Sequence, residues 1–542
     1  MLRVAGHIVD IHREEIFPGE VLVRDGMIAE IVRKDSAPDR YILPGFVDAH
    51  IHVESSMLAP AELSRAATVH GTVATVSDPH EIANVVGVAG VHYMIAEARK
   101  AALKIHYGAP PCVPATSFEN AGAVLGPADV EQLLASPDIF YLSEVMNFPG
   151  VLAGDPDLLA KIAAAQKHGK PVDGHAPQLI AEIAAYAATG ISTDHECVTL
   201  EEGLARLAAG MKVLIREGSA ARNYEALHPL LREAPEHCMF CSDDLHPDSL
   251  AVGHIDRLVK RAIAADIPLF SVLRAACRNP VEHYRLPVGL LREGDPADFI
   301  MVDDLRFFGV LQTYINGTLV AQAGRSLLPF QEPALINCFR AVPIQPAALK
   351  VPSTLSEPLV NVIVAQDEQL ITGSEKIRMR AEDGELKPDL ARDILKIAVV
   401  NRYQTAPPAV AFIRNFGLKQ GAIASSVAHD SHNIVAVGTN DESLALAINL
   451  IVANQGGICA VSPVEERVLP LPIAGLMSNR PADEVAKAYA DIEELARSLG
   501  SPLKAPLMAL SFMALLVIPE LKLSDLGLFD GRKFAFTPLV EA

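Results

Sequence analysis

Hydrophobic residues recur in eight short runs through the middle of the chain, and stretches with helical spacing separate them. The runs cover residues 46–52, 72–78, 103–107, 139–144, 171–175, 191–195, 213–217 and 239–243. Buried strands that alternate with helices indicate βαβ units, and eight such units over about 240 residues are typical of a closed barrel. The pattern therefore predicts an α/β fold with a TIM-like (β/α)8 barrel at residues 44–284.

The segments on either side of this region alternate polar and apolar residues, as half-buried strands do. Residues 1–43 contain a hairpin signal at Asp25-Gly26, and residues 310–320 contain another at Asn316-Gly317. We therefore expect residues 1–43 and 285–328 to form a β-sandwich domain that flanks the barrel.

The rest of the chain predicts a linker followed by a third domain. Six prolines lie between Pro329 and Pro358 with little periodicity, which indicates a linker over residues 329–358. Residues 359–542 contain a strand pattern at 433–438 and a helix pattern at 442–454. We expect this segment to be a C-terminal α/β (α+β) domain.

Composition narrows the class of protein. The formal charge of −20 argues against a nucleic-acid partner, which would need clustered basic residues. The longest apolar segment, residues 505–518, is too short to span a membrane and is followed by Pro519. Seven scattered cysteines do not indicate a disulfide framework, and no apolar signal core precedes Asp10. We expect a cytoplasmic protein with no membrane partner.

Side chains that can bind metal follow five of the predicted strands. His50 and His52 are two residues apart, so in a strand they point to the same face. The carboxyl ends of barrel strands converge, so these residues should meet others at the same end. The candidate ligands are His50, His52, Glu144, His175, His195 and Asp243. Each histidine alone could be an ordinary polar loop residue, but the whole set predicts two divalent ions, with Glu144 as a bridge. Asp243 would bind one ion and also accept a proton from the reacting water.

Asp78-Pro79-His80-Glu81 follows the second predicted strand, at the mouth of the barrel. One interpretation is a helix start capped by Asp78 or Ser77. The other is that Glu81 transfers protons to and from a substrate. Both interpretations can hold together.

Two further polar segments are candidate substrate contacts. In Ile215–Asn223, Arg216 and the turn at Ser219 could face a heterocycle, or Arg216 could simply pair with Glu217. The turn Gly218-Ser219-Ala220 could offer backbone donors. The segment His429–His432 could be a lid through which His429 and His432 reach the barrel, or it could be solvated surface.

A zinc deaminase signature of another kind is a weaker interpretation. His52-Val53-Glu54 and Cys238-x-x-Cys241 resemble its two parts, but His237 stands where that signature has proline. Cys241 lies on the predicted eighth strand and is better explained as a small core residue.

The chain resembles the amidohydrolase superfamily and, within it, the bacterial adenine deaminases. The resemblance includes Pro44–Met57, Asp78–Val85, Asp173–His175, His195-Glu196, Ile215–Asn223 and Ser242–Asp244. It continues through Ser426–Ile434 and Leu471–Ser478, in the third domain that general amidohydrolases lack. Asn147 and Cys197 depart from the family pattern, and neither is a predicted ligand.

The resemblance implies hydrolysis of adenine to hypoxanthine and ammonia by a metal-activated hydroxide that attacks C6. It implies Mn²⁺, Fe²⁺ or Zn²⁺ at the six ligands, with Mn²⁺ favoured. It also implies proton transfer by Glu81 and a homo-oligomer such as a dimer. Two alternatives stay open, which are a hydrolase of another cyclic amide or amidine, and an inactive metal-binding scaffold.

Overall fold

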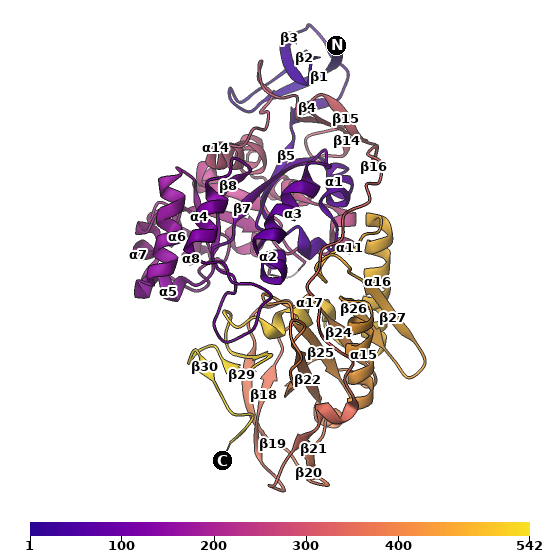
Figure 1. The fold of residues 1–542 in the computed structure, drawn as a ribbon. Coiled ribbons are helices and arrows are strands. Elements are labelled where there is room, and N and C mark those ends of the chain that lie inside the picture. Colours follow the sequence, from indigo (N-terminus) through magenta and orange to yellow (C-terminus); the bar gives the residue numbers. More distant parts are fainter. Residues whose placement is uncertain (220, 542) are drawn as a thin grey trace.

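The barrel lies between a β-sheet domain at one end and the C-terminal domain at the other (Figure 1). The computed structural model describes residues 1–219 and 221–541, so Ala220 and Ala542, at the end of the predicted third domain, lie outside the described residues. The two termini lie at opposite ends of the molecule (Figure 1). Within the described ranges, each helix is too short or too polar to traverse a lipid bilayer.

Eight parallel strands form the barrel, in sequence order. They are β5 (Phe46–Ile51), β6 (Thr72–Ser77), β7 (Lys104–Ala109), β8 (Ile139–Val145), β9 (Val172–Gly174), β10 (Thr193–Asp194), β11 (Lys212–Arg216) and β12 (Cys238–Cys241). The sheet closes where the Asp243 amide donates to the His50 carbonyl at 2.8 Å. Helices cover the outer face, so β5, β6 and β12 are buried along their whole length.

The barrel fold predicted from the eight apolar runs is confirmed, and the strand ends differ by one or two residues. The helices of this region are α1 (Pro60–Thr68), α2 (His80–Val86), α3 (Val88–Ala98), α4 (Pro127–Leu134), α5 (Phe148–Ala153), α6 (Pro156–Lys167), α7 (Ile183–Ala188), α8 (Leu200–Ala208), α9 (Tyr224–Leu227), α10 (Leu230–Glu233), α11 (Pro247–Val252), α12 (Ile255–Ala264), α13 (Leu269–Leu273) and α14 (Asn279–Tyr284).

The two segments that flank the barrel in sequence join in one eight-stranded sheet. Its strands are β1 (Leu2–Asp10), β2 (Glu15–Arg24), β3 (Met27–Arg33), β4 (Tyr41–Pro44), β13 (Phe299–Val302), β14 (Val310–Ile315), β15 (Thr318–Gln322) and β16 (Arg325–Ser326). Strand β4 joins the two halves, since it pairs with β1 and with β13. Apolar residues of both halves, including Val21 and Phe299, pack into one cluster. Both hairpin turns have positive φ at Asp25-Gly26 and Asn316-Gly317, as type I′ turns require.

The third region is built on a mixed, mainly antiparallel sheet. Residues 329–345 contain no helix or strand, and the predicted linker then includes β17 (Val351–Pro352). The main sheet contains β18 (Leu359–Val364), β19 (Gly373–Arg378), β22 (Ile394–Val400), β23 (Ala409–Arg414), β24 (Ala422–Ser425), β25 (Ile434–Gly438), β26 (Gly457–Val461), β27 (Glu466–Pro470) and β31 (Val540–Glu541). Two small sheets contain β20 (Ala381–Glu382), β21 (Glu385–Leu386), β28 (Leu521–Ser524), β29 (Gly527–Asp530) and β30 (Ala535–Phe536). The helices are α15 (Asp441–Ala453), α16 (Ala482–Ser498) and α17 (Pro506–Ser511).

The C-terminal domain packs directly on the barrel. One apolar cluster contains residues of both, such as Met57 and Leu58 from the barrel and Met477 and Leu510 from the third domain. The Ser478 amide also donates to the Met57 carbonyl at 2.8 Å. The carboxyl mouth of the barrel, where ligands bind in this architecture, is therefore covered by the third domain.

Candidate metal centre

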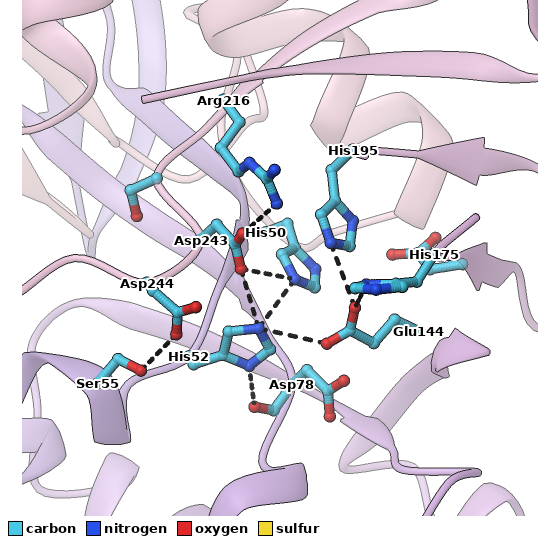
Figure 2. Close-up of polar contacts among 12 residues, drawn as sticks. His50, His52, Ser55, Asp78, Glu144, His175, His195, Arg216, Asp243 and Asp244 are labelled. Atoms are coloured by element: carbon cyan, nitrogen blue, oxygen red, sulfur yellow. Dashed lines mark hydrogen bonds and ion pairs between the residues drawn. The ribbon is translucent and has the colours of Figure 1, made fainter. Parts of the chain in front are cut away.

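The structure brings all six predicted ligands together at the carboxyl end of the barrel (Figure 2). They come from five strands or from the one or two residues after each strand, and none is more than 7% exposed. Parallel strands that end at one rim account for this convergence of residues far apart in sequence.

Glu144 lies between two sets of imidazoles. Its Oε2 is 2.7 Å from His175 Nδ1 and 3.2 Å from His195 Nε2. Its Oε1 is 3.3 Å from His52 Nε2. One carboxylate thus directs one oxygen to each set, which is the arrangement that a bridging ligand needs.

His50, His52 and Asp243 form the other side of the centre. His52 Nε2 lies 3.2 Å from His50 Nε2 and 3.0 Å from Asp243 Oδ1. His52 Nδ1 lies 3.2 Å from the Asp78 carbonyl and donates its hydrogen there, so Nε2 directs a lone pair into the centre. Converging lone pairs of imidazoles and carboxylates are satisfied by a divalent cation, so the residues fit metal ions.

The two acidic ligands are held in their ionised form. Burial alone would raise the pKa of Glu144, but His175 and His195 outweigh it and hold that pKa well below its ordinary value. Burial likewise opposes ionisation of Asp243, yet the Arg216 guanidinium and the neighbouring imidazoles keep its pKa well below the usual range. Both carboxylates can therefore act as anionic ligands at neutral pH.

Arg216 is placed against the centre rather than beside Glu217. Its Nη1 donates to Asp243 Oδ2 at 2.6 Å and also pairs with Glu196. The suggested Arg216–Glu217 pair is wrong, because Arg216 pairs with Glu196 and Asp243, whereas Glu217, the residue after β11, pairs with Arg261. Arg216 thus orients the Asp243 carboxylate.

Glu81 lies beside the centre in the first turn of α2 and is fully buried. The Ser55 hydroxyl lies 2.6 Å from Glu81 Oε1 and 2.5 Å from Asp244 Oδ1. A hydroxyl has one hydrogen, so one of these contacts needs a proton on a carboxyl group. Burial raises the pKa of Glu81, which makes Glu81 the natural holder of that proton.

The segment His429–His432 reaches this site from the third domain. His429 Nδ1 lies 3.7 Å and His432 Nε2 3.9 Å from the Glu81 carboxyl oxygens. Asp430 Oδ1 lies 3.5 Å from His80 Nε2. All four residues of the segment are buried, so the solvated-surface alternative is wrong, because the third domain presses this loop into the barrel mouth.

The start of α2 differs in detail from its prediction. Pro79 occupies the cap position with non-helical backbone angles and makes no side-chain bond, so neither Ser77 nor Asp78 is the capping residue. Asp78 Oδ1 still accepts from the His80 amide at 3.1 Å. Asp78, one residue before the cap position, therefore still stabilises the first turn of α2.

The remaining predicted residues lie outside the cluster. Ser219 Oγ accepts from the His246 amide at 2.8 Å, and this pair lines a neighbouring cavity. Ala220 of the predicted donor turn lies outside the described residues. Cys238 and Cys241 are free and buried in β12, as expected of core residues. Asn147, one of the departures from the family pattern, caps α5 by accepting from the Gly150 amide at 3.0 Å.

Five residues of the site were not among the predicted site residues. They are Ser55, His80, Glu196, Asp244 and Asp430. His80 and Asp430 lie inside polar segments that the sequence analysis had singled out. The sequence did not predict that these two side chains are buried beside the centre. A single serine such as Ser55 carries no sequence signal, because its role depends on two carboxyl groups from distant segments, Glu81 of α2 and Asp244 after β12.

A closed eight-stranded barrel with buried imidazoles and carboxylates at its carboxyl mouth is the architecture of a metal-dependent hydrolase. Comparison with known proteins agrees with this class. Residues 41–320 match the amidohydrolase family, and residues 369–535 match the adenine deaminase C-terminal domain.

Relatives match the chain over nearly its whole length. An adenine deaminase of Salinibacter ruber is 56% identical over 98% of this chain and 98% of its own. An adenine deaminase of Sulfurovum sp. is 56% identical over 99% of each chain, and one of Methanosarcina mazei is 49% identical over 99% of each. The chain belongs to the amidohydrolase family and, within it, to the adenine deaminases.

Proposed function

We propose that this protein converts adenine and water to hypoxanthine and ammonia, using two divalent metal ions. The observation that carries the proposal is Glu144, which directs one carboxylate oxygen to each of two sets of imidazoles. Full-length similarity to adenine deaminases supports adenine as the substrate.

Six residues would hold the ions. His50, His52 and Asp243 would bind one ion, His175 and His195 the other, and Glu144 both. When bound, the ions lower the pKa of a water molecule and polarise the atom under attack. The donor set suits Mn²⁺, Fe²⁺ and Zn²⁺, and we propose Mn²⁺ first.

The side chains of the chain account for the proton transfers. The water oxygen forms a bond to C6, the bond between C6 and the amine breaks, and the two water protons pass to the ring nitrogen and the leaving ammonia. Asp243, oriented by Arg216, accepts the first proton. Glu81, whose pKa is raised by burial, delivers a proton to the ring nitrogen or the amine.

Substrate contacts by His429, His432, Arg216 and Ser219 stay predictions. His429 lines the small cavity over the ligands, whereas Ser219 lines the larger cavity beside it. Arg216 would act through Asp243. We also propose a homodimer, which light scattering of the purified protein tests.

The test is a spectroscopic assay of Mn²⁺-loaded protein with adenine, in which the ultraviolet spectrum should shift to that of hypoxanthine. Turnover of another cyclic amide or amidine without this shift would favour the alternative hydrolase. Full metal loading with no turnover of either class would indicate an inactive scaffold.

A further inference from the structure

A second cavity, of about 250 Å³, lies next to the metal centre, between the barrel and the C-terminal domain. Ser219, His246 and Ser249 line it from the barrel, and Tyr489, Met508 and Phe512 line it from the third domain. The barrel helix α11 and the third-domain helix α16 pack side by side along it (Figure 1). The cavity therefore exists only because the two domains are packed together.

The space directly over the metal ligands is much smaller, at about 30 Å³. Phe512 lines both spaces, and its ring stacks on His429 at a centroid distance of 4.9 Å. Phe512 is thus part of the wall of both spaces.

His246, which lines this cavity, has one ring nitrogen without a hydrogen-bond partner among the described residues. The Tyr489 hydroxyl donates to Glu493 Oε1 at 3.0 Å, and Glu493 also accepts from the Leu507 amide and from Arg497. His246 Nδ1 lies 2.5 Å from the Tyr489 oxygen, so its N–H donates there and Nε2 is left with a lone pair.

That lone pair is buried and unpartnered. His246 is 2% exposed, and its Nε2 has no hydrogen-bond partner among the residues that the structure describes. Burial, together with the nearby His429, lowers the pKa of His246 to about 3, so the ring is neutral. A buried acceptor without a donor is costly unless a ligand supplies the donor.

We propose that this cavity binds the purine substrate and product outside the metal centre, and that His246 Nε2 accepts a hydrogen bond from an N–H group of the base. This inference rests on the proposed function and deepens it, because it names a specificity-determining residue for that substrate. Apolar Met508 and Phe512 give the flat base its packing surface.

The charges of the cavity favour a neutral base over a phosphorylated one. Lys504 and Arg222 lie 2.5 Å and 3.9 Å from Glu368, and Arg497 lies 3.1 Å from Glu493. These cations are already paired with carboxylates, so they do not form a phosphate site. The chemistry of the cavity wall therefore favours an uncharged purine that carries N–H donors.

The test compares His246→Ala with the parent holoenzyme, using adenine as substrate and hypoxanthine as inhibitor. We expect the KM for adenine and the hypoxanthine inhibition constant to rise about tenfold each, the size of one hydrogen bond, with kcat within about threefold. Metal content should be unchanged. His237→Ala, an exposed residue directly before β12, is the matched control and should match the parent. An unchanged KM and inhibition constant, or a fall in kcat alone, would overturn the proposal.

A second variant keeps the test independent of how His246→Ala folds. Ser249→Trp fills the cavity from α11 and should weaken hypoxanthine binding, measured by calorimetry on the metal-loaded protein. Equal binding by the variant and the parent would overturn the proposal. If the parent does not deaminate adenine, the proposed function fails, yet the same calorimetric comparison with adenine and hypoxanthine still decides whether the cavity binds a purine.

Discussion

At the scale of single residues, Glu144 is the side chain on which we expect the candidate metal centre to depend. Glu144→Gln keeps the shape but removes the negative charge that faces both sets of imidazoles. We expect it to reduce bound metal and to lower deamination by about 100-fold or more, measured by elemental analysis and the ultraviolet assay. Glu131→Gln, a surface residue of α4 paired with Lys167, is the control. Parent-like metal content and activity in Glu144→Gln would show that the centre is elsewhere.

Glu119 gives a prediction for stability against pH. Burial and the nearby Asp430 raise the pKa of Glu119 from 4.5 to about 8. The folded state therefore binds this proton more tightly than the unfolded state, and its contribution to stability is lost as pH rises from about 4.5 to about 8. Glu119→Gln should raise the melting temperature at pH 8 and change it little at pH 4.5, measured by calorimetry. A stabilisation that is equal at both pH values would contradict this origin.

The candidate ligands were predictable at this scale because each one ends an apolar run at a regular position. The role of Asp48 was not predictable in this way. Its carboxylate accepts hydrogen bonds from the amides of His50 and Ser242 and from His254 Nε2, at 3.2, 3.1 and 2.8 Å. It joins β5 to β12, which are nearly 200 residues apart in sequence. Residues whose role is to connect distant segments leave no local pattern.

At the scale of elements, one side chain fixes the loop after β7 to the C-terminal domain. Asp525 accepts from the Asn120 amide at 3.0 Å and from the Asn120 and Asn401 side chains, each at 2.7 Å. Asp525→Ala leaves these donors unpaired, so we expect faster hydrogen exchange in residues 113–125 and a lower kcat/KM. Asp530→Ala, at the half-buried end of β29, is the control. Exchange that matches the parent would mean that other contacts hold this loop.

Helices and strands were predicted well where segments that are close in sequence bury their apolar face. The barrel strands and the hairpins at Asp25-Gly26 and Asn316-Gly317 follow from local periodicity and turn chemistry. The burial of residues 429–432 does not, because a third domain supplies the covering surface. A polar loop inserted into another domain has the same composition as a solvated one.

At the scale of the whole molecule, metal removal should lower stability. The centre holds several carboxylates and imidazoles that are all nearly inaccessible, and cations offset their mutual repulsion. Ions present at 1,000 times their Kd contribute about 4 kcal/mol to folding. We expect the protein treated with a chelator to unfold at a temperature several degrees lower, and added Mn²⁺ to restore it. A melting temperature that is insensitive to the chelator would contradict this coupling.

The third domain covers the candidate ligands, and this cover affects how the protein acquires its metal. No candidate ligand is more than 7% exposed, and His429 and Phe512 line the space above them. We expect bound ions to exchange slowly through this narrow space, so that kinetics after folding govern which ion is bound. We therefore expect the bound ion to reflect which ion was abundant when the chain folded, rather than the order of equilibrium affinities. Protein folded in Mn²⁺ and then incubated with Zn²⁺ should keep its manganese for much longer than an open site would, as isotope-resolved elemental analysis can show.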